Sequence, residues 1–144
     1  MDKLTCRFIS STEELEEAFN IRRRVFVEQQ GIPEEIELDE YDRVARHIIV
    51  KDGDKAIATA RVQFPEKGIA KIERMAVLKE FRRRGTGSNI ISFLSEEFKK
   101  RKVEQVVLHA QYAVLGFYRS CGFEEIGEPF IEAGIRHIKM EKHL

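Results

Sequence analysis

Apolar residues follow two different spacings along the chain, and each spacing predicts one kind of secondary structure. Within residues 10–31 they recur every three or four positions, which is the period of one helix face. The members of this stripe are Leu15, Ala18, Phe19 and Phe26. Ser11 followed three residues later by Glu14 is typical of a capping box, and Gly31 is a suitable end. The pattern therefore predicts a long amphipathic helix near the N-terminus.

Short apolar-rich segments with turn residues between them predict strands on either side of this helix. Residues 46–64 hold two such segments around Asp52 and Gly53, a pair that is typical of a hairpin turn. Residues 68–78 supply a further strand, and residues 4–9 an earlier one. We expect a three-stranded antiparallel meander after the first helix.

The second half of the chain returns to helical spacing and then ends in strands. Apolar residues from Gly87 onward recur on one helix face until the basic run at residues 99–102, whose charge suits a helix C-terminus. A strand at residues 104–110, a helix at residues 112–122 and two strands follow; the strands are residues 122–130 and 134–144. This order predicts an α/β fold, with a mixed, largely antiparallel sheet and helices on both faces.

The composition favours a globular protein that forms one domain over residues 1–144. Hydrophobic residues make up 42% and charged residues 35% of the chain, and no apolar run approaches the roughly 18 residues of a membrane span. The N-terminus shows no signal peptide, so the cytoplasm is the expected compartment. Cys6 and Cys121 have no metal or redox spacing, which predicts free structural thiols and no metal site.

Charge is balanced overall but unevenly distributed. The 25 basic residues equal the 25 acidic ones, which argues against a protein that holds nucleic acid through its net charge. Basic residues gather at Arg22–Arg24 and Arg82–Arg84, and acidic ones at residues 33–42. We interpret Arg22–Arg24 as a solvated helix face. A nucleic-acid surface made by both arginine runs is the less favoured alternative.

The loop at residues 80–87 joins positive charge to backbone freedom at the start of a helix. The first amides of a helix lack partners within it and carry partial positive charge, so this position suits an anion. Gly85 and Gly87 would allow positive φ and a close approach of the backbone to a pyrophosphate. An ordinary loop with solvated arginines is equally consistent with the spacing. The sequence lacks the spacing of a Walker loop or of a dinucleotide-binding loop.

This loop and the segments around it resemble one known family. Residues 82–87, "RRRGTG", match the (Arg/Gln)-x-x-Gly-x-(Gly/Ala) loop of the GNAT superfamily of N-acetyltransferases, and the strand "IERMAVL" precedes it as in that family. The segments "RRRVFVEQQGIP" and "LHAQYAVLGFYRSCGFEEIGEPFIEAGIRHIKMEK" are similar to a small, single-domain bacterial-type subgroup. The resemblance implies the GNAT acyl-CoA acyltransferase fold and acetyl transfer to a primary amine by direct transfer in a ternary complex.

The resemblance also implies how acetyl-CoA would bind, with CoA as the product. Backbone groups exposed by a strand bulge would contact the pantetheine arm and the oxyanion; they belong to Met75, Ala76 and Val77. Loop residues would bind the pyrophosphate; they are Arg82, Arg83, Arg84, Gly85, Thr86 and Gly87. Tyr118 would lie near the cofactor sulfur, where a phenol can protonate a thiolate. A packing role for this tyrosine is the alternative.

Three further groups are candidates for the amine. His137 would deprotonate the incoming ammonium, although Arg136 stands where the subgroup usually has proline. Glu73 occupies a common general-base position, on the strand face that also carries Lys71 and Met75, and an ion pair with Arg61 or Arg74 is its alternative. Two residues of the later strand could line the acceptor pocket; they are His109 and Gln111.

The resemblance leaves the acceptor and the assembly open. The acidic residues 34–42 would lie along the acceptor wall, which favours an acceptor that carries positive charge. A homodimer is an expectation because dimers are frequent in the resembled family. The main alternative to an enzyme is a catalytically weak regulatory module that binds CoA or acetyl-CoA.

Overall fold

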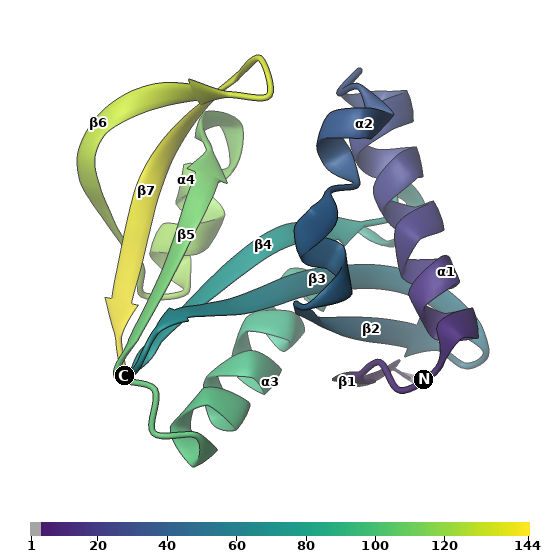
Figure 1. The fold of residues 1–144 in the computed structure, drawn as a ribbon, viewed down its shortest axis with the longest axis horizontal. Helices are drawn as coiled ribbons and strands as arrows, with labels where there is room; N and C mark the ends of the chain where they lie inside the picture. The colour runs from purple at the N-terminus through teal and green to yellow at the C-terminus, as the bar shows by residue number, and fades with distance from the viewer. Residues whose placement is uncertain (1–3) are drawn as a thin grey trace.

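The computed structural model describes residues 4–144, which form one twisted sheet with helices packed against it (Figure 1). The helices are α1 (Thr12–Arg22), α2 (Glu34–Glu37), α3 (Thr86–Lys100) and α4 (Leu115–Ser120). The strands are β1 (Leu4–Phe8), β2 (Arg46–Asp52), β3 (Lys55–Glu66), β4 (Ile69–Val77), β5 (Gln105–Gln111), β6 (Glu124–Glu132) and β7 (Ile135–His143). This order confirms the predicted sequence of elements. None of the helices between residues 4 and 144 is long and apolar enough to cross a membrane.

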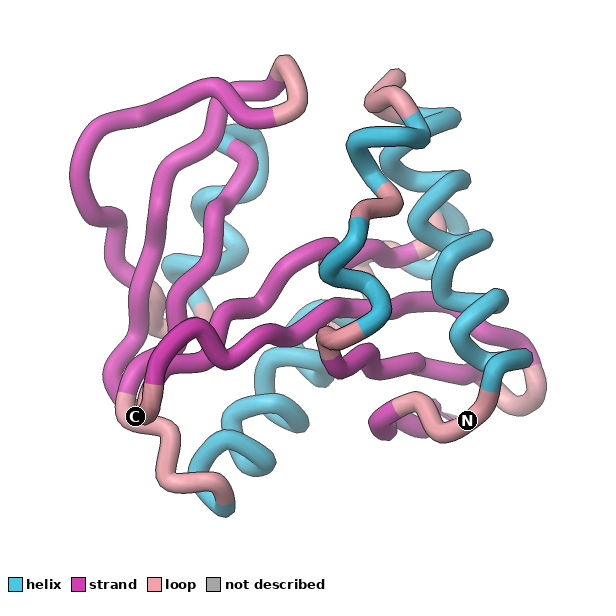
Figure 2. The backbone as a smooth tube through the Cα atoms, viewed as in Figure 1, coloured by secondary structure: helices cyan, strands magenta, loops and turns pink. Residues whose placement is uncertain are grey.

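The seven strands lie in the order β1-β2-β3-β4-β5-β7-β6. Only the β4–β5 contact is parallel, and every other neighbouring pair is antiparallel, which confirms the mixed, largely antiparallel sheet. Figure 2 shows β4 and β5 meeting near the C-terminus and then diverging. The β2–β3 hairpin is also confirmed, with its two turn residues at Gly53 and Asp54, one position later than expected.

Two apolar clusters cover opposite faces of the sheet. The larger cluster packs α3 on one face and includes Ile90, Leu94 and Phe98. A smaller cluster packs the first helix on the other face, where Val25 and Phe26 meet Ala76 of β4 and Leu78, which follows that strand. Burial of these apolar stripes accounts for the helices on both faces, as the periodicity predicted.

The predicted N-terminal helix changes geometry part-way. The α1 helix ends at Arg22 and continues as a π-helical segment, Arg23–Gln29. Ser11 caps α1 by accepting a hydrogen bond from the Glu14 amide at 3.2 Å. The Glu14 carboxylate accepts from the Ser10 amide instead of that of Ser11, so only one half of the expected capping box forms.

A bulge in β4 reverses the alternation of side chains along the strand. Arg74 has a φ of 52°, and the register with β3 shifts next to it. Before the bulge, Glu73 points away from the α3 cluster, whereas Met75 after the bulge packs against that cluster. The expectation that Glu73 and Met75 share a face is therefore wrong, because the extra residue turns the later part of the strand over.

Candidate active site

The splay between β4 and β5 leaves part of one strand edge without a partner. Parallel pairing joins Ile69–Ile72 to Gln105–Leu108 and stops there. Since β3 lies on the other side of β4, residues 73–77 face the splay with backbone groups that no strand pairs within residues 4–144. A strand edge of this kind can add an extended ligand through main-chain hydrogen bonds.

The N-terminus of α3 opens at the same end of the splay as this edge. Gly85 is the N-cap residue with a φ of 78°, and no side chain caps the helix. Residues 82–85 are exposed, and the first intrahelical bond runs from the Asn89 amide to the Gly85 carbonyl at 3.0 Å. The amides of the first turn are therefore available to an anion.

Two of the three loop arginines already have partners. Arg82 donates through Nε to the Val77 carbonyl at 2.8 Å and through Nη2 to Gln29 Oε1 at 2.9 Å. The Arg84 guanidinium lies 5.3 Å from the centre of the Phe81 ring. Arg82 thus ties the loop to the end of β4 and uses one of the carbonyls that the sequence assigned to the cofactor.

Gly87 serves packing, and its φ lies outside the positive range. A Cβ atom built on Gly87 would lie 2.8 Å from Phe117 Cζ, a distance that real Cβ atoms do not adopt. The expected positive φ belongs to Gly85 and not to Gly87, because Gly87 lies inside the regular turns of α3. Glycine at residue 87 therefore lets α3 and α4 approach closely.

Tyr118 lies in α4, on the face of the sheet that α3 covers. Its ring packs against the α3 cluster, with ring centres 5.0 Å from Phe117 and 6.0 Å from Phe123. Burial, with a smaller effect from Cys121, raises the pKa of the Tyr118 phenol above its ordinary value. The hydroxyl therefore keeps its proton at neutral pH.

The groups predicted for the amine come together on the opposite face. His109 alternates with Leu108 and Ala110, which belong to the α3 cluster, so His109 and Gln111 point to the side of α1. His137 of β7 lies directly opposite Gln111 of β5, so its side chain also points to the side of α1. Two residues at the β6–β7 turn pack against the smaller apolar cluster, which contains the first helix; they are Ala133 and Ile135. This contact brings the face of the histidines close to α1.

Glu132 joins the two histidines, and the sequence analysis did not identify it. His109 Nδ1 lies 2.9 Å from Glu132 Oε1, and His137 Nε2 lies 4.0 Å from Glu132 Oε2. Phe130 contacts both imidazoles, edge-on to His109 and stacked on His137. The signal that could have found Glu132 is its place in the hairpin opposite the histidine strand, since β6 pairs with β7 around a short turn.

Glu73 takes part in an ion-pair cluster on this same face. Its Oε2 accepts from Arg61 Nε at 2.7 Å, Gln63 Nε2 donates to both carboxylate oxygens at 3.1 Å, and Lys71 Nζ lies 3.3 Å from Oε1. Burial alone would raise the pKa of Glu73, but the charge and hydrogen bonds of Arg61 outweigh it and leave the pKa lowered. The structure thus shows the ion-paired alternative for Glu73, with Arg61 as the partner.

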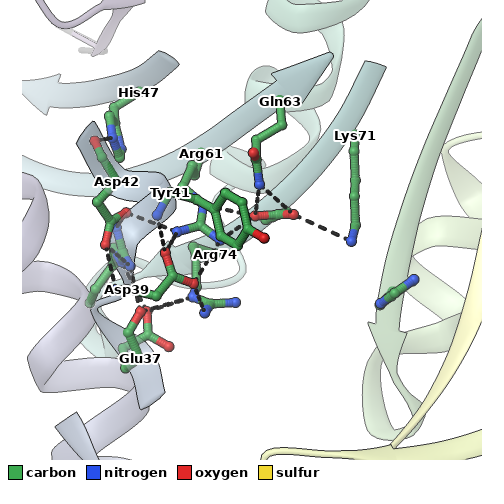
Figure 3. A network of polar contacts seen from close by, with 12 residues as sticks. Glu37, Asp39, Tyr41, Asp42, His47, Arg61, Gln63, Lys71 and Arg74 are labelled. Carbon is green, nitrogen blue, oxygen red and sulfur yellow. Dashed lines mark hydrogen bonds and ion pairs between the residues drawn. The ribbon is translucent and has the colours of Figure 1, made fainter. Parts of the chain in front are cut away.

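A buried network continues from Arg61 to the acidic segment (Figure 3). Arg61 Nη1 donates to Asp39 at 2.6 Å and to Asp42 at 3.0 Å. Arg22, which is 0% exposed, donates to Glu37 at 2.9 Å and to Asp42 at 2.7 Å. The interpretation of Arg22 as part of a solvated face is therefore wrong, and its burial removes it from any nucleic-acid surface.

The same network includes three carboxylates of the acidic segment, residues 34–42. Glu37, Asp39 and Asp42 are all paired with arginines, and Arg74 bonds the Glu37 carbonyl at 3.1 Å and Asp39 Oδ2 at 3.1 Å. These three carboxylates are paired within the protein and add little to a negative wall, whereas Glu34, Glu35 and Glu40 of the same segment are exposed. The preference for a cationic acceptor therefore stays a prediction.

Comparison with known proteins identifies the family that has this architecture. Residues 10–144 match the family model described as "Acetyltransferase (GNAT) domain". The chain belongs to the GNAT acetyltransferase family. It is 36% identical over 131 residues to the uncharacterized N-acetyltransferase YjcF of Bacillus subtilis, covering 90% of this chain and 93% of that protein.

Solved structures show the same GNAT fold over the full length of the chain. An acyl-CoA N-acyltransferase from Pseudomonas aeruginosa superposes with a TM-score of 0.84 at 25% identity and covers 99% of both chains. A GNAT family acetyltransferase from Elizabethkingia anophelis with acetyl-CoA bound gives a TM-score of 0.78 over 100% of both chains. At 16% identity the second likeness concerns the fold alone.

Gln111 of this GNAT protein bonds a side chain from the segment that follows α1. Its amide and that of Gln30 bond reciprocally, at 2.9 and 3.3 Å, and so join the end of β5 to the segment after α1. Gln29, the neighbour of Gln30, bonds Arg82. Gln29 and Gln30 thus connect the end of the first helical segment to the loop after β4 and to the end of β5.

Proposed function

We propose that this GNAT protein is an N-acetyltransferase that moves the acetyl group of acetyl-CoA directly to a primary amine in a ternary complex. The observation that carries the proposal is the division of groups between the two faces of the sheet. The open α3 N-terminus and Tyr118 lie on the α3 face, and His109 and His137 lie on the α1 face. The splay between β4 and β5 lies between the two groups.

The residues on the α3 side fit an acyl-CoA. The unpaired edge at Met75–Val77 suits the amide-rich pantetheine arm, and the free amides at residues 85–88 suit a pyrophosphate. A fold neighbour is described with acetyl-CoA bound. Acetyl-CoA would supply the acetyl group: its carbon–sulfur bond breaks as carbon bonds to the amine nitrogen, and sulfur keeps the electron pair.

Two side chains would move the protons of this reaction. His137 Nε2 accepts the first proton from the ammonium, so that the nitrogen gains a lone pair, and Tyr118 donates its hydroxyl proton to the departing thiolate. The nitrogen loses a second proton as the amide forms, and exchange with solvent restores His137 and Tyr118. In total the ammonium gives up two protons, of which one stays on CoA and one is released. Glu73 holds Arg61 and Lys71 in place.

The first experiment measures binding and turnover separately. Calorimetry with acetyl-CoA and CoA tests the donor site, and thiol release is then followed over a panel of polyamines, amino acids, aminoglycosides and lysine peptides. Binding with turnover supports the proposal. Binding without turnover on any amine would favour the regulatory module, and failure to bind either ligand would contradict both.

Tyr118→Phe tests the role of the phenol. We expect kcat to fall by about 10²–10⁴-fold because the thiolate loses its proton donor, while the dissociation constant for acetyl-CoA stays within about twofold. Tyr112→Phe is the matched control, since Tyr112 is exposed in the turn before α4. An equal kcat in the two variants would exclude Tyr118 as the acid.

A further inference from the structure

Glu132 lies between two histidines that come from two different strands. It is the last residue of β6, and its side chain is 43% exposed. His109 on β5 holds one carboxylate oxygen at 2.9 Å, and His137 on β7 lies 4.0 Å from the other. The second oxygen of Glu132 therefore points toward His137 without forming a hydrogen bond to it.

The hydrogen bonds of His137 fix which nitrogen can accept a proton. Nδ1 lies 2.7 Å from the Ile135 carbonyl, which can only accept, so Nδ1 carries a hydrogen. In the neutral imidazole the lone pair is then on Nε2. This tautomer follows from the position of the carbonyl.

His137 Nε2 is open to a ligand, although the residue as a whole is buried. Glu132 Oε2 lies 4.0 Å from this nitrogen, which is too long for a hydrogen bond. Within residues 4–144, His47 Nδ1 is the only side-chain nitrogen or oxygen that is fully buried and has no hydrogen-bond partner. His137 Nε2 is not among such atoms although it has no hydrogen bond, so it retains some exposure to solvent. The free Nε2 of His137 is therefore reached from outside.

We propose that Glu132 Oε2 and His137 Nε2 form the seat for the ammonium group of the acceptor. Two acceptors 4.0 Å apart can each receive an N–H bond of about 2.9 Å from one nitrogen, with an angle of about 90° between the bonds. A primary ammonium can donate to both and keep its carbon chain directed away. This inference rests on the proposed acetyltransferase function and names the site that receives the amine.

The charges around the seat favour a cation over a neutral or anionic group. The hydrogen bond from His109 lowers the pKa of Glu132, so the carboxylate stays charged. The other titratable groups of this face are on four strands: Arg61 of β3, Lys71 and Glu73 of β4, His109 of β5, and Lys139, Glu141 and His143 of β7. Lys71 is already paired with Glu73 at 3.3 Å. A hydroxyl has one hydrogen and can serve only one of the two acceptors, so the seat selects amines over alcohols.

The seat also performs the first chemical step. The ammonium transfers one proton to His137 Nε2, and the electron pair of the broken N–H bond stays on nitrogen as the lone pair that attacks the thioester carbon. The negative charge of Glu132 stabilises the imidazolium that forms. His109 acts as a positioning residue, because its bond to Oε1 directs Oε2 toward the amine.

The test compares Glu132→Gln with His137→Gln on the best amine of the panel. Glu132→Gln should raise the KM for the amine about tenfold or more, because a charge-assisted bond is lost, and His137→Gln should lower kcat by about 100-fold. The dissociation constant for acetyl-CoA should stay unchanged in both variants. Glu128→Gln is the matched control, since Glu128 is exposed on the same strand.

The outcomes separate this inference from the proposed function. If the wild-type protein acetylates no amine, the proposed function fails. If it acetylates amines and Glu132→Gln behaves like Glu128→Gln, the seat is wrong and the function stands.

A measurement on the wild-type protein does not depend on how the variants fold. With CoA bound, which cannot donate an acetyl group, added amine should shift the imidazole NMR signals of His109 and His137 but leave those of His143 unchanged. Unchanged signals for His109 and His137 at an amine concentration well above KM would also overturn the proposal.

Discussion

Arg22 lies at the centre of the contacts that hold the acidic segment on the sheet. It is fully buried, and all three nitrogen atoms of its guanidinium form hydrogen bonds to Glu37 or Asp42. Replacing one member of a buried ion cluster leaves the remaining charges without compensation. This residue therefore matters more for stability than its neighbours in the same basic run.

Arg22→Met tests this difference. We expect the free energy of unfolding to fall by about 3–5 kcal/mol, because two buried carboxylates each lose one of their arginine partners. Urea denaturation followed by circular dichroism measures the change. Arg23→Met is the control: Arg23 pairs with the exposed Glu34 at 3.2 Å, and such surface pairs contribute about 0–1 kcal/mol. Similar losses in the two variants would contradict the role assigned to Arg22.

Residue-level predictions failed where a partner is distant in sequence. The burial of Arg22 depends on Glu37 and Asp42, which follow it by 15 and 20 residues, so the local pattern showed only a basic run. Glu132 was missed because it meets His109 across a strand that separates them in the sheet. In contrast, the roles of Tyr118 and His137 come from their match to a family pattern and stay predictions.

At the scale of elements, α3 and α4 are in contact at Gly87 of α3, which has no side chain. The ring of Phe117 fills the space where a Cβ of Gly87 would be, so the position of the α3 N-terminus depends on α4. Since Tyr118 follows Phe117, this contact links the first turn of α3, the proposed pyrophosphate site, to the proposed acid.

Gly87→Ala should disturb both elements together. We expect a loss of about 1–3 kcal/mol in the free energy of unfolding, with weaker binding of acetyl-CoA in calorimetry, because the methyl group displaces Phe117. Phe117→Leu removes the clashing Cζ atom, so the same glycine change in that background should cost less. Gly116→Ala, which meets nothing within 4 Å, is the control. Equal effects of Gly87→Ala in the two backgrounds would disprove the coupling.

Most elements were predictable because their apolar periods are local properties. Two irregularities were not, since each depends on packing against the rest of the fold. The π-helical segment Arg23–Gln29 interrupts a stripe that looks like a regular helix, and the bulge at Arg74 turns Met75 toward α3 although simple alternation places it with Glu73. The family resemblance did predict a bulge at this strand, and the structure confirms it.

At the scale of the whole molecule, the sheet separates two tasks. Its α3 face carries the open helix N-terminus, and its α1 face carries the histidines with the arginine–carboxylate network behind them. The network joins α1, the acidic segment, β3 and β4, so the α1 face should keep its shape only while those carboxylates are charged.

The stability of the protein should accordingly fall in acid. Burial alone would raise the pKa of Asp42, but its bonds to Arg22 and Arg61 lower it from an ordinary value of 3.8 to about 2. The folded state therefore binds this proton less readily than the unfolded chain. The stabilisation is complete above about pH 4 and is lost as the pH falls toward 2, and it amounts to about 2 kcal/mol. Glu37, whose pKa is raised by burial, contributes with the opposite sign.

Urea unfolding of the wild-type protein and of Asp42→Asn, from pH 6 to pH 2.5, measures this contribution. The difference in unfolding free energy between them should shrink by about 1.5 kcal/mol over that range, since at pH 2.5 Asp42 is protonated in the unfolded chain but still largely charged in the folded protein. Asp54→Asn, in the exposed β2–β3 turn, should show no such narrowing. A constant difference for Asp42→Asn would mean that the arginines hold residue 42 through geometry alone, and that the charge of the network does not maintain the α1 face.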